Sequence, residues 1–217
     1  AYELSLGLVG SEMCIRDRAY QDLRQKLNTA GMSNTPLTES SLFLVQDVGA
    51  ASSYQFSLLN TEGTPKSYEI RLAQADSFFM TAWQLVIGLG AAADDPETQW
   101  YTYPAEVIGG AYNDYYAIYN SYLSVTVNNK RWIQDYSTNK FLTIPVTQRL
   151  STAVNQNFNE YGGQNDNTQY LATHIQLSGA KKNQIEMQLP AAVAAPIANT
   201  FVGLYCYGLV AIGGAVY

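Results

Sequence analysis

Apolar and polar residues alternate along several segments of the chain, which is the pattern of β-strands that bury one face. The alternating segments are Ser53–Leu58, Tyr68–Leu72, Leu123–Val127, His174–Leu177 and Gln184–Leu189. Asn128-Asn129 follows the third of these and predicts a hairpin turn before Trp132 and Ile133. At least five half-buried strands are therefore expected.

Two longer segments, Ser77–Leu89 and Phe201–Tyr217, are apolar at both alternating sets of positions. We expect central strands covered on both faces, or strands that meet a neighbouring subunit. The second segment lies within Ile197–Tyr217, 21 residues without a charged side chain, which is also close to the length of a membrane-spanning helix. Its Asn199, three Tyr and four Gly, without a basic flank, favour a buried strand.

Helical spacing is found in residues 19–30, where Tyr20, Leu23 and Leu27 share one face. A short amphipathic helix or a partner-binding arm is expected there. Helical insertions between strands are expected at Ala111–Tyr122 and Val146–Phe158. Many strands with few short helices predict an all-β fold, an antiparallel β-sandwich with short helical insertions.

The composition shifts the expected function away from enzymes. The 217 residues suit one domain, and only 14% of them are charged, against roughly 25% in an average soluble domain. Thirty Asn and Gln and 17 Tyr supply polar groups instead. A disordered protein is excluded, because such proteins lack the apolar and aromatic residues that make up 47% and 12% of this chain. The net charge of −6 does not favour a nucleic-acid binder, since the basic pairs Lys130-Arg131 and Lys181-Lys182 lie apart at predicted turns.

Candidates for catalysis or metal binding are few. His174 is the single His, and no G-x-S-x-G motif accompanies it, so we expect a surface His. Cys206 lies in an apolar run, which predicts a buried structural thiol. The acids of Asp94–Glu97 lack a spacing that separates catalytic carboxylates from solvated ones. Asn155–Asn167 offers oxygen ligands for calcium, but it lacks the Gly and the carboxylates of an EF-hand loop, so we favour a polar surface loop. We expect no enzyme, no cofactor and no metal site.

The first residues are set apart from the fold. The string SEMCIRDR, Ser11–Arg18, resembles conceptually translated sequencing-adapter DNA, and no basic region or A-x-A site supports a signal peptide. We interpret residues 1–18 as a non-native segment, residues 19–33 as an N-terminal helix or arm, and residues 34–217 as the β-sandwich domain.

Two segments carry a longer pattern: E-x-R-L-x-x-x-D-x-F from Glu69 to Phe78, and Y-N-x-x-L-x-x-x-V-N-N from Tyr119 to Asn129. With the segments around them in residues 34–190, they resemble the major capsid proteins of small tailless icosahedral bacteriophages. The resemblance implies a jelly roll of two four-stranded sheets, and the length suits a single jelly roll rather than a double one. It further implies a virion subunit that assembles with itself as a trimer or higher lattice and with other virion proteins, without sequence-specific nucleic-acid binding.

Aromatic residues provide the candidate contacts. A dense cluster of candidate subunit-interface residues consists of Tyr112, Tyr115, Tyr116, Tyr119 and Tyr122, because Tyr is enriched at interfaces. At helical spacing, the same residues are equally consistent with one buried face. The alternative function is an extracellular carbohydrate-binding β-sandwich module, whose candidate ligand-stacking residues are Trp100, Tyr101, Tyr103 and Trp132.

Overall fold

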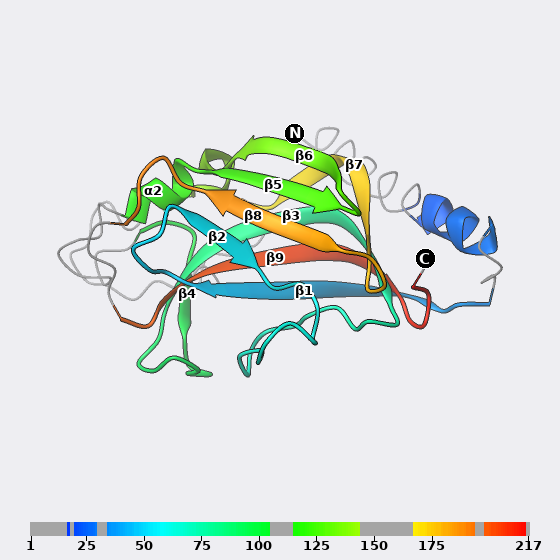
Figure 1. The fold of residues 1–217 in the computed structure, drawn as a ribbon, viewed down its shortest axis with the longest axis horizontal. Coiled ribbons are helices and arrows are strands. Elements are labelled where there is room, and N and C mark those ends of the chain that lie inside the picture. The colour runs from blue at the N-terminus through cyan, green and yellow to red at the C-terminus, as the bar shows by residue number, and fades with distance from the viewer. Residues whose placement is uncertain are drawn as a thin grey trace, which may run out of the picture.

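Two antiparallel sheets packed against each other form the body of the protein, which confirms the predicted all-β sandwich (Figure 1). The structure is a computed structural model that describes residues 17, 20–29, 34–104, 115–143, 167–193 and 198–215. Residues 20–29 form a helix. The later elements are β1 (Leu37–Asp47), β2 (Ser53–Phe56), β3 (Ser77–Leu89), β4 (Gln99–Tyr101), α2 (Tyr116–Tyr119), β5 (Tyr122–Val127), β6 (Lys130–Ser137), the 3-10 helix η3 (Thr138–Phe141), β7 (Gln169–Ser178), β8 (Asn183–Gln188) and β9 (Thr200–Ala211).

The strand order is that of a jelly roll. Sheet A has the order β1-β9-β3-β4, and β7 pairs with β3 along the same edge as β4. Sheet B has the order β2-β8-β5-β6. Without the short β4, four strands in the order β1-β9-β3-β7 face four in the order β2-β8-β5-β6, which is the arrangement of two Greek keys in an eight-stranded jelly roll. The described residues therefore form a single jelly roll.

The main core lies between the two sheets and follows from the alternating pattern. The inward positions of sheet B are apolar and buried: Tyr54, Phe56, Leu123, Val125, Ile185 and Met187. Trp83 of β3 is fully buried opposite them, with its ring 5.0 Å from that of Tyr136 and 5.8 Å from that of Phe141. Burial of apolar surface on this scale is the main favourable term in folding.

The hairpin turn predicted at Asn128-Asn129 is confirmed. Both residues have positive φ angles, 50° and 63°, as a type I′ turn between two strands requires. The strands predicted around Tyr54, Leu123, His174 and Ile185 are also present, as β2, β5, β7 and β8. β3 and β9 are central strands of sheet A, as their apolar sequences predicted. No helix among the described residues is long and apolar enough to cross a membrane.

The strand predicted over Tyr68–Leu72 is wrong. Only isolated bridges form there, and Ile70, expected inside, is 52% exposed. The side chains of Glu69 and Arg71, expected outside, are 1% and 7% exposed because they form an ion pair with each other. The helical insertion predicted over Ala111–Tyr122 is reduced to the four residues of α2 in the described part of the chain. The one predicted over Val146–Phe158 lies outside the described residues.

Candidate functional site

Candidate nucleophiles and metal ligands do not gather in the part of the chain that the structure describes. No group of three or more His, Cys, Asp or Glu side chains there has the arrangement of a metal site. Cys206 is fully buried, as predicted, and burial raises the pKa of its thiol to about 12. The thiol is therefore protonated at neutral pH and is a poor nucleophile. His174 is partly exposed on β7, with its ring 5.6 Å from that of Phe79.

Two acidic residues of the loop between β3 and β4 accept hydrogen bonds from backbone N–H groups and from one serine hydroxyl. Asp94 accepts the backbone N–H and the hydroxyl of Ser67, at 2.7 and 2.9 Å, and these two bonds lower the pKa of its carboxyl. Asp95 accepts the backbone N–H groups of Ala91 and Glu97, each at 2.9 Å. The Asp95–Glu97 bond is that of an Asx turn, whereas the Asp94 bonds hold this loop to Ser67 in the loop between β2 and β3.

The loop between β2 and β3 is held to the edge of sheet A by one buried carboxylate. Glu69 accepts the backbone N–H of Val45 at 2.9 Å and pairs with the guanidinium of Arg71 at 2.7 Å. Ile70, between these two charged residues, exchanges both backbone hydrogen bonds with Phe43 of β1, at 2.8 and 3.0 Å. The loop therefore covers part of the free edge of β1, where an unpaired strand invites another chain. The sequence pattern gave no sign of this arrangement.

The outer face of sheet A, which points away from sheet B, is aromatic at one end. Its cluster consists of Phe43, Val45, Val86, Trp100 and Phe201, with Tyr68 and Tyr205 packed against them. The Phe43 ring stacks on Tyr205 with 3.9 Å between centroids and meets Trp100 edge-on at 4.8 Å. Gly88 and Gly203 make room, since a Cβ on either would lie within 2.8 Å of a ring atom of this cluster.

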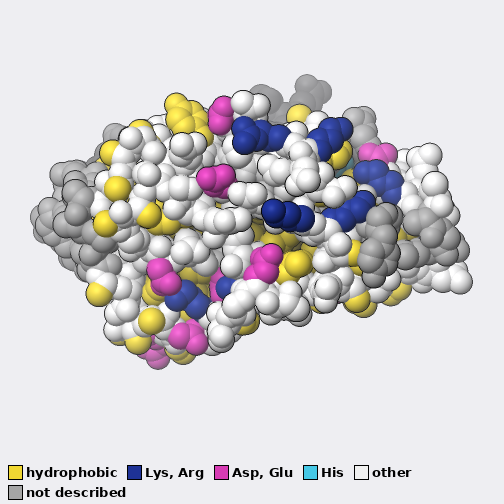
Figure 2. All heavy atoms as spheres, viewed as in Figure 1, with side chains coloured by type: hydrophobic (Ala, Val, Ile, Leu, Met, Phe, Trp, Pro, Cys, Tyr) yellow, Lys and Arg dark blue, Asp and Glu magenta, His cyan; other side chains and the backbone are white. Residues whose placement is uncertain are grey.

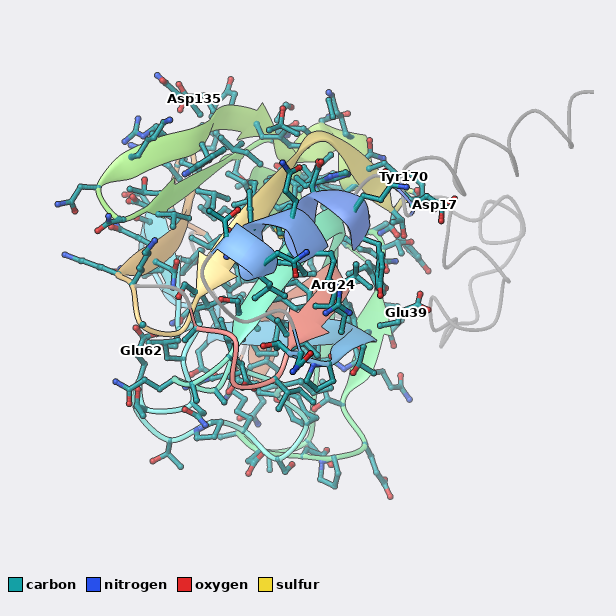
Figure 3. The ribbon with its side chains drawn as sticks, turned by 90° about the vertical axis from the view of Figure 1, so that its right-hand side faces the viewer. Asp17, Arg24, Glu39, Glu62, Asp135 and Tyr170 are labelled. Carbon is teal, nitrogen blue, oxygen red and sulfur yellow. The ribbon has the colours of Figure 1, made fainter. Side chains whose placement is uncertain are left out.

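The other end of the same face is covered by the helix of residues 20–29, which confirms the helix prediction. Leu23 and Leu27 are fully buried against Phe79 and Ala211. Arg24 donates to the backbone carbonyl of Thr35 at 2.9 Å. Figure 3 shows the helix lying across the end of the sandwich, with Arg24 on it. A partner-binding role for this segment stays a prediction.

Sheet B presents a different outer face. On β2, β5 and β8, the side chains that alternate with the buried ones belong to Ser53, Gln55, Tyr122, Ser124, Thr126, Gln184, Glu186 and Gln188. The edge strand β6 borders them, with Arg131 opposite Thr126. None of the four hydrophobic clusters of described residues includes a residue of this set. Its single carboxylate, Glu186, accepts the Ser53 hydroxyl at 2.8 Å. We call these eight residues the neutral face.

The candidate interface tyrosines separate into buried and exposed groups. Tyr115 and Tyr119 are fully buried in the main core, so the interpretation as a buried face is the correct one for these two. Burial raises the pKa of the Tyr119 phenol well above its ordinary value. Tyr116 is partly exposed, and Tyr122 is 48% exposed on the neutral face. Tyr112 lies outside the described residues.

Three of the four candidate ligand-stacking residues are not available to a ligand. Trp100, Tyr101 and Tyr103 are 7%, 0% and 5% exposed, because sheet A and its neighbouring loops enclose them. The prediction of a stacking role is therefore wrong for these three. Trp132 on β6 is 42% exposed, with the Lys130 ammonium 4.9 Å from the centre of its ring.

Comparison with known proteins places the chain in no family: no family model, no curated protein and no solved structure matches it.

Proposed function

We propose that this chain is a structural protein, the major capsid subunit of a virus, which assembles with copies of itself into an icosahedral shell. The observation that carries the proposal is the strand order of its two facing four-stranded sheets. Jelly rolls of this kind serve in viral capsid domains, in lectins and in cupins. Because one fold supports several functions, the choice among them has to be argued from the surfaces of this chain.

The neutral face supports subunit contact. Seven of its eight residues carry hydroxyl or amide groups, and only Glu186 is charged. Burying a charged group between subunits costs far more than burying a hydroxyl or amide that finds a hydrogen-bond partner. Protein interfaces are accordingly depleted in Lys, Glu and Asp and enriched in Tyr. Tyr122, exposed on this face, is the candidate anchor of such a contact.

The carbohydrate-binding alternative has less support. It needs exposed rings that can stack on sugars, and three of its four candidate rings are buried. Trp132 is the remaining candidate, and one exposed ring offers only one stacking contact to a sugar chain.

Negative-stain electron microscopy of the purified full chain tests the proposal. We expect closed particles of uniform size, and a field of single subunits at high protein concentration would contradict it. Tyr122→Ser is expected to reduce the yield of particles without unfolding the subunit. Ile212→Ser is the matched control, because Ile212 is 55% exposed beyond β9, far along the chain from the neutral face. Glycan binding by single subunits, lost in Trp132→Ala, would support the alternative instead.

A further inference from the structure

The two basic pairs that lie apart in the sequence meet at one corner of the sandwich. β5 lies between β6 and β8, so the β5–β6 turn and the β7–β8 turn are neighbours. The backbone N–H of Asn128 in the first turn donates to the carbonyl of Lys182 in the second at 2.8 Å. The cations of this corner are Lys130, Arg131, Lys181 and Lys182, and we call them the basic corner.

Hydrogen bonds to the backbone hold the two turns of the basic corner in place. Asn183 donates its side-chain amide to the carbonyls of Ser178 and Lys181, at 2.8 and 2.9 Å, and so fixes the β7–β8 turn. On the other turn, the strand register sets Lys130 opposite Val127. The four cations therefore project from two turns with defined conformations, and ordering them on a ligand costs less than ordering a mobile arm.

The positive charge of the corner is not neutralised. None of its four cations forms an ion pair with another residue that the structure describes, whereas Lys66 and Arg71 elsewhere do. Figure 2 shows dark blue side chains across the upper and right-hand part of this face, with a few magenta carboxylates near them, and a smaller blue area among magenta carboxylates at the lower left. The nearest carboxylate along β8 is Glu186, which is bonded to Ser53. Figure 3 shows Asp135 projecting outward from the other part of β6.

An exposed indole stands beside these cations. Trp132 follows Arg131 on β6, and the ammonium of Lys130 lies over its ring at 4.9 Å. The other two tryptophans, Trp83 and Trp100, are 0% and 7% exposed. Phosphate groups recognised by Lys and Arg, next to a base stacked on an aromatic ring, are the usual elements of single-stranded nucleic-acid binding.

We propose that the basic corner and Trp132 bind single-stranded nucleic acid without sequence preference, with phosphates on the four cations and one base stacked on the indole. An anionic membrane is the weaker partner, because the tip of the β5–β6 turn is Asn128-Asn129, whose exposed amides would be dehydrated on insertion. The proposal stands on this corner alone and does not depend on shell assembly, so a chain that never forms particles is still expected to bind.

Fluorescence anisotropy with a labelled 20-mer of thymidine tests it on the full chain over a salt series. With four phosphate contacts, the logarithm of the affinity should fall with the logarithm of salt with a slope of about −3. Lys181→Gln with Lys182→Gln should reduce that slope by about half. Lys140→Gln is the matched control, because Lys140 lies over the Tyr136 ring at 4.6 Å, away from the corner, and its loss should leave the slope unchanged.

Trp132→Leu separates stacking from charge. It should weaken binding of the thymidine 20-mer by about 5- to 150-fold at fixed salt, with an unchanged slope. Binding of an abasic 20-mer should not respond to the substitution. Quenching of Trp132 emission by thymidine gives a second readout, since the other two indoles are buried. Wild-type affinity in Trp132→Leu, an unchanged slope in the double Lys variant, or binding to phosphatidylserine vesicles but not to the 20-mer would overturn the proposal.

Discussion

The outer faces of the two sheets differ sharply although both belong to one sandwich. Sheet A carries aromatic side chains on its outer face, and the helix of residues 20–29 and the β2–β3 loop cover much of them. Strands β2, β5 and β8 of sheet B carry the hydroxyls and amides of the neutral face, outside every hydrophobic cluster of the described residues. The comparison indicates that the chain covers much of the apolar outer surface of sheet A with its own segments. Among the described residues, the neutral face stays uncovered by such segments, and it is the surface that we propose for contact with other subunits.

The largest expected loss of stability comes from removing the Glu69 carboxylate, which holds the β2–β3 loop on the edge of sheet A. Glu69→Ala leaves the buried Arg71 guanidinium with only the carbonyl of Glu62 and without a carboxylate, and the N–H of Val45 without its acceptor. Breaking a buried ion pair in this way costs about 3–5 kcal/mol, so the urea midpoint should fall strongly. Glu97→Ala, an exposed carboxylate in the neighbouring loop, is the control and should change little. Equal midpoints for both variants would show that the loop does not seal the sheet.

A smaller loss is expected when the helical cover is weakened. Leu27→Ala removes a fully buried side chain from its contact with Phe79 and Ala211. Truncation of a buried Leu costs 2–5 kcal/mol, and we expect about 2 kcal/mol because the helix can undock without unfolding the sandwich. Hydrogen exchange of residues 20–29 should rise well above that of the sheets. Gln25→Ala, on the exposed side of the helix, should leave exchange as in the wild type.

Substitution of one glutamine on each outer face compares how much the two faces contribute to stability. Gln84 on the outer side of β3 is fully buried, accepts the Tyr207 hydroxyl at 2.8 Å and donates to Asn167. Gln184 on β8 belongs to the neutral face. Gln84→Ala should cost about 1–3 kcal/mol of unfolding free energy because its partners lose their bonds. Gln184→Ala should stay within about 0.5 kcal/mol. Similar losses at both positions would remove the distinction between the faces.

Two tyrosines on the outer face of sheet A lead us to expect a loss of stability at high pH. Burial raises the pKa of both Tyr68 and Tyr207 to about 12, above the ordinary value of 10.0. The folded state therefore favours the neutral phenols, and their contribution is complete below pH 10 and is lost as pH rises through 12. Because both rings are partly exposed, the effect should be the smallest of this series. Unfolding by urea at pH 8 and pH 11 measures it, and identical midpoints would contradict it.

Strand alternation predicted sheet B well because each of its strands has one buried and one solvated face. β5 and β8 follow this pattern, and the Asn128-Asn129 turn has its own local signature. β1 was not predicted as a strand, since its apolar run Leu42–Val45 has polar residues on both sides and does not alternate with them. The segment from Tyr68 to Leu72 was predicted as a strand because its apolar and charged residues alternate. The prediction failed because the ion pair of Glu69 and Arg71 is buried while Ile70 is exposed, and periodicity does not register ion pairs.

The candidate surfaces were harder to predict than the fold because they depend on which segments meet. Trp100 follows an acidic loop and suggested an exposed platform, but β4 places its ring on Phe43. The pairs Lys130-Arg131 and Lys181-Lys182 are separated by about 50 residues in the sequence, and only the pairing of β5 with β8 joins them. Local patterns carry no information on such long-range neighbours.

The measurement that tests the account most directly is light scattering of the purified full chain over a dilution series. The account predicts a mass that is a large multiple of the 23.9 kDa subunit and falls on dilution or in Tyr122→Ser. A mass of one subunit at every concentration, with a cooperatively folded protein, would contradict the claim that the neutral face joins copies of this chain.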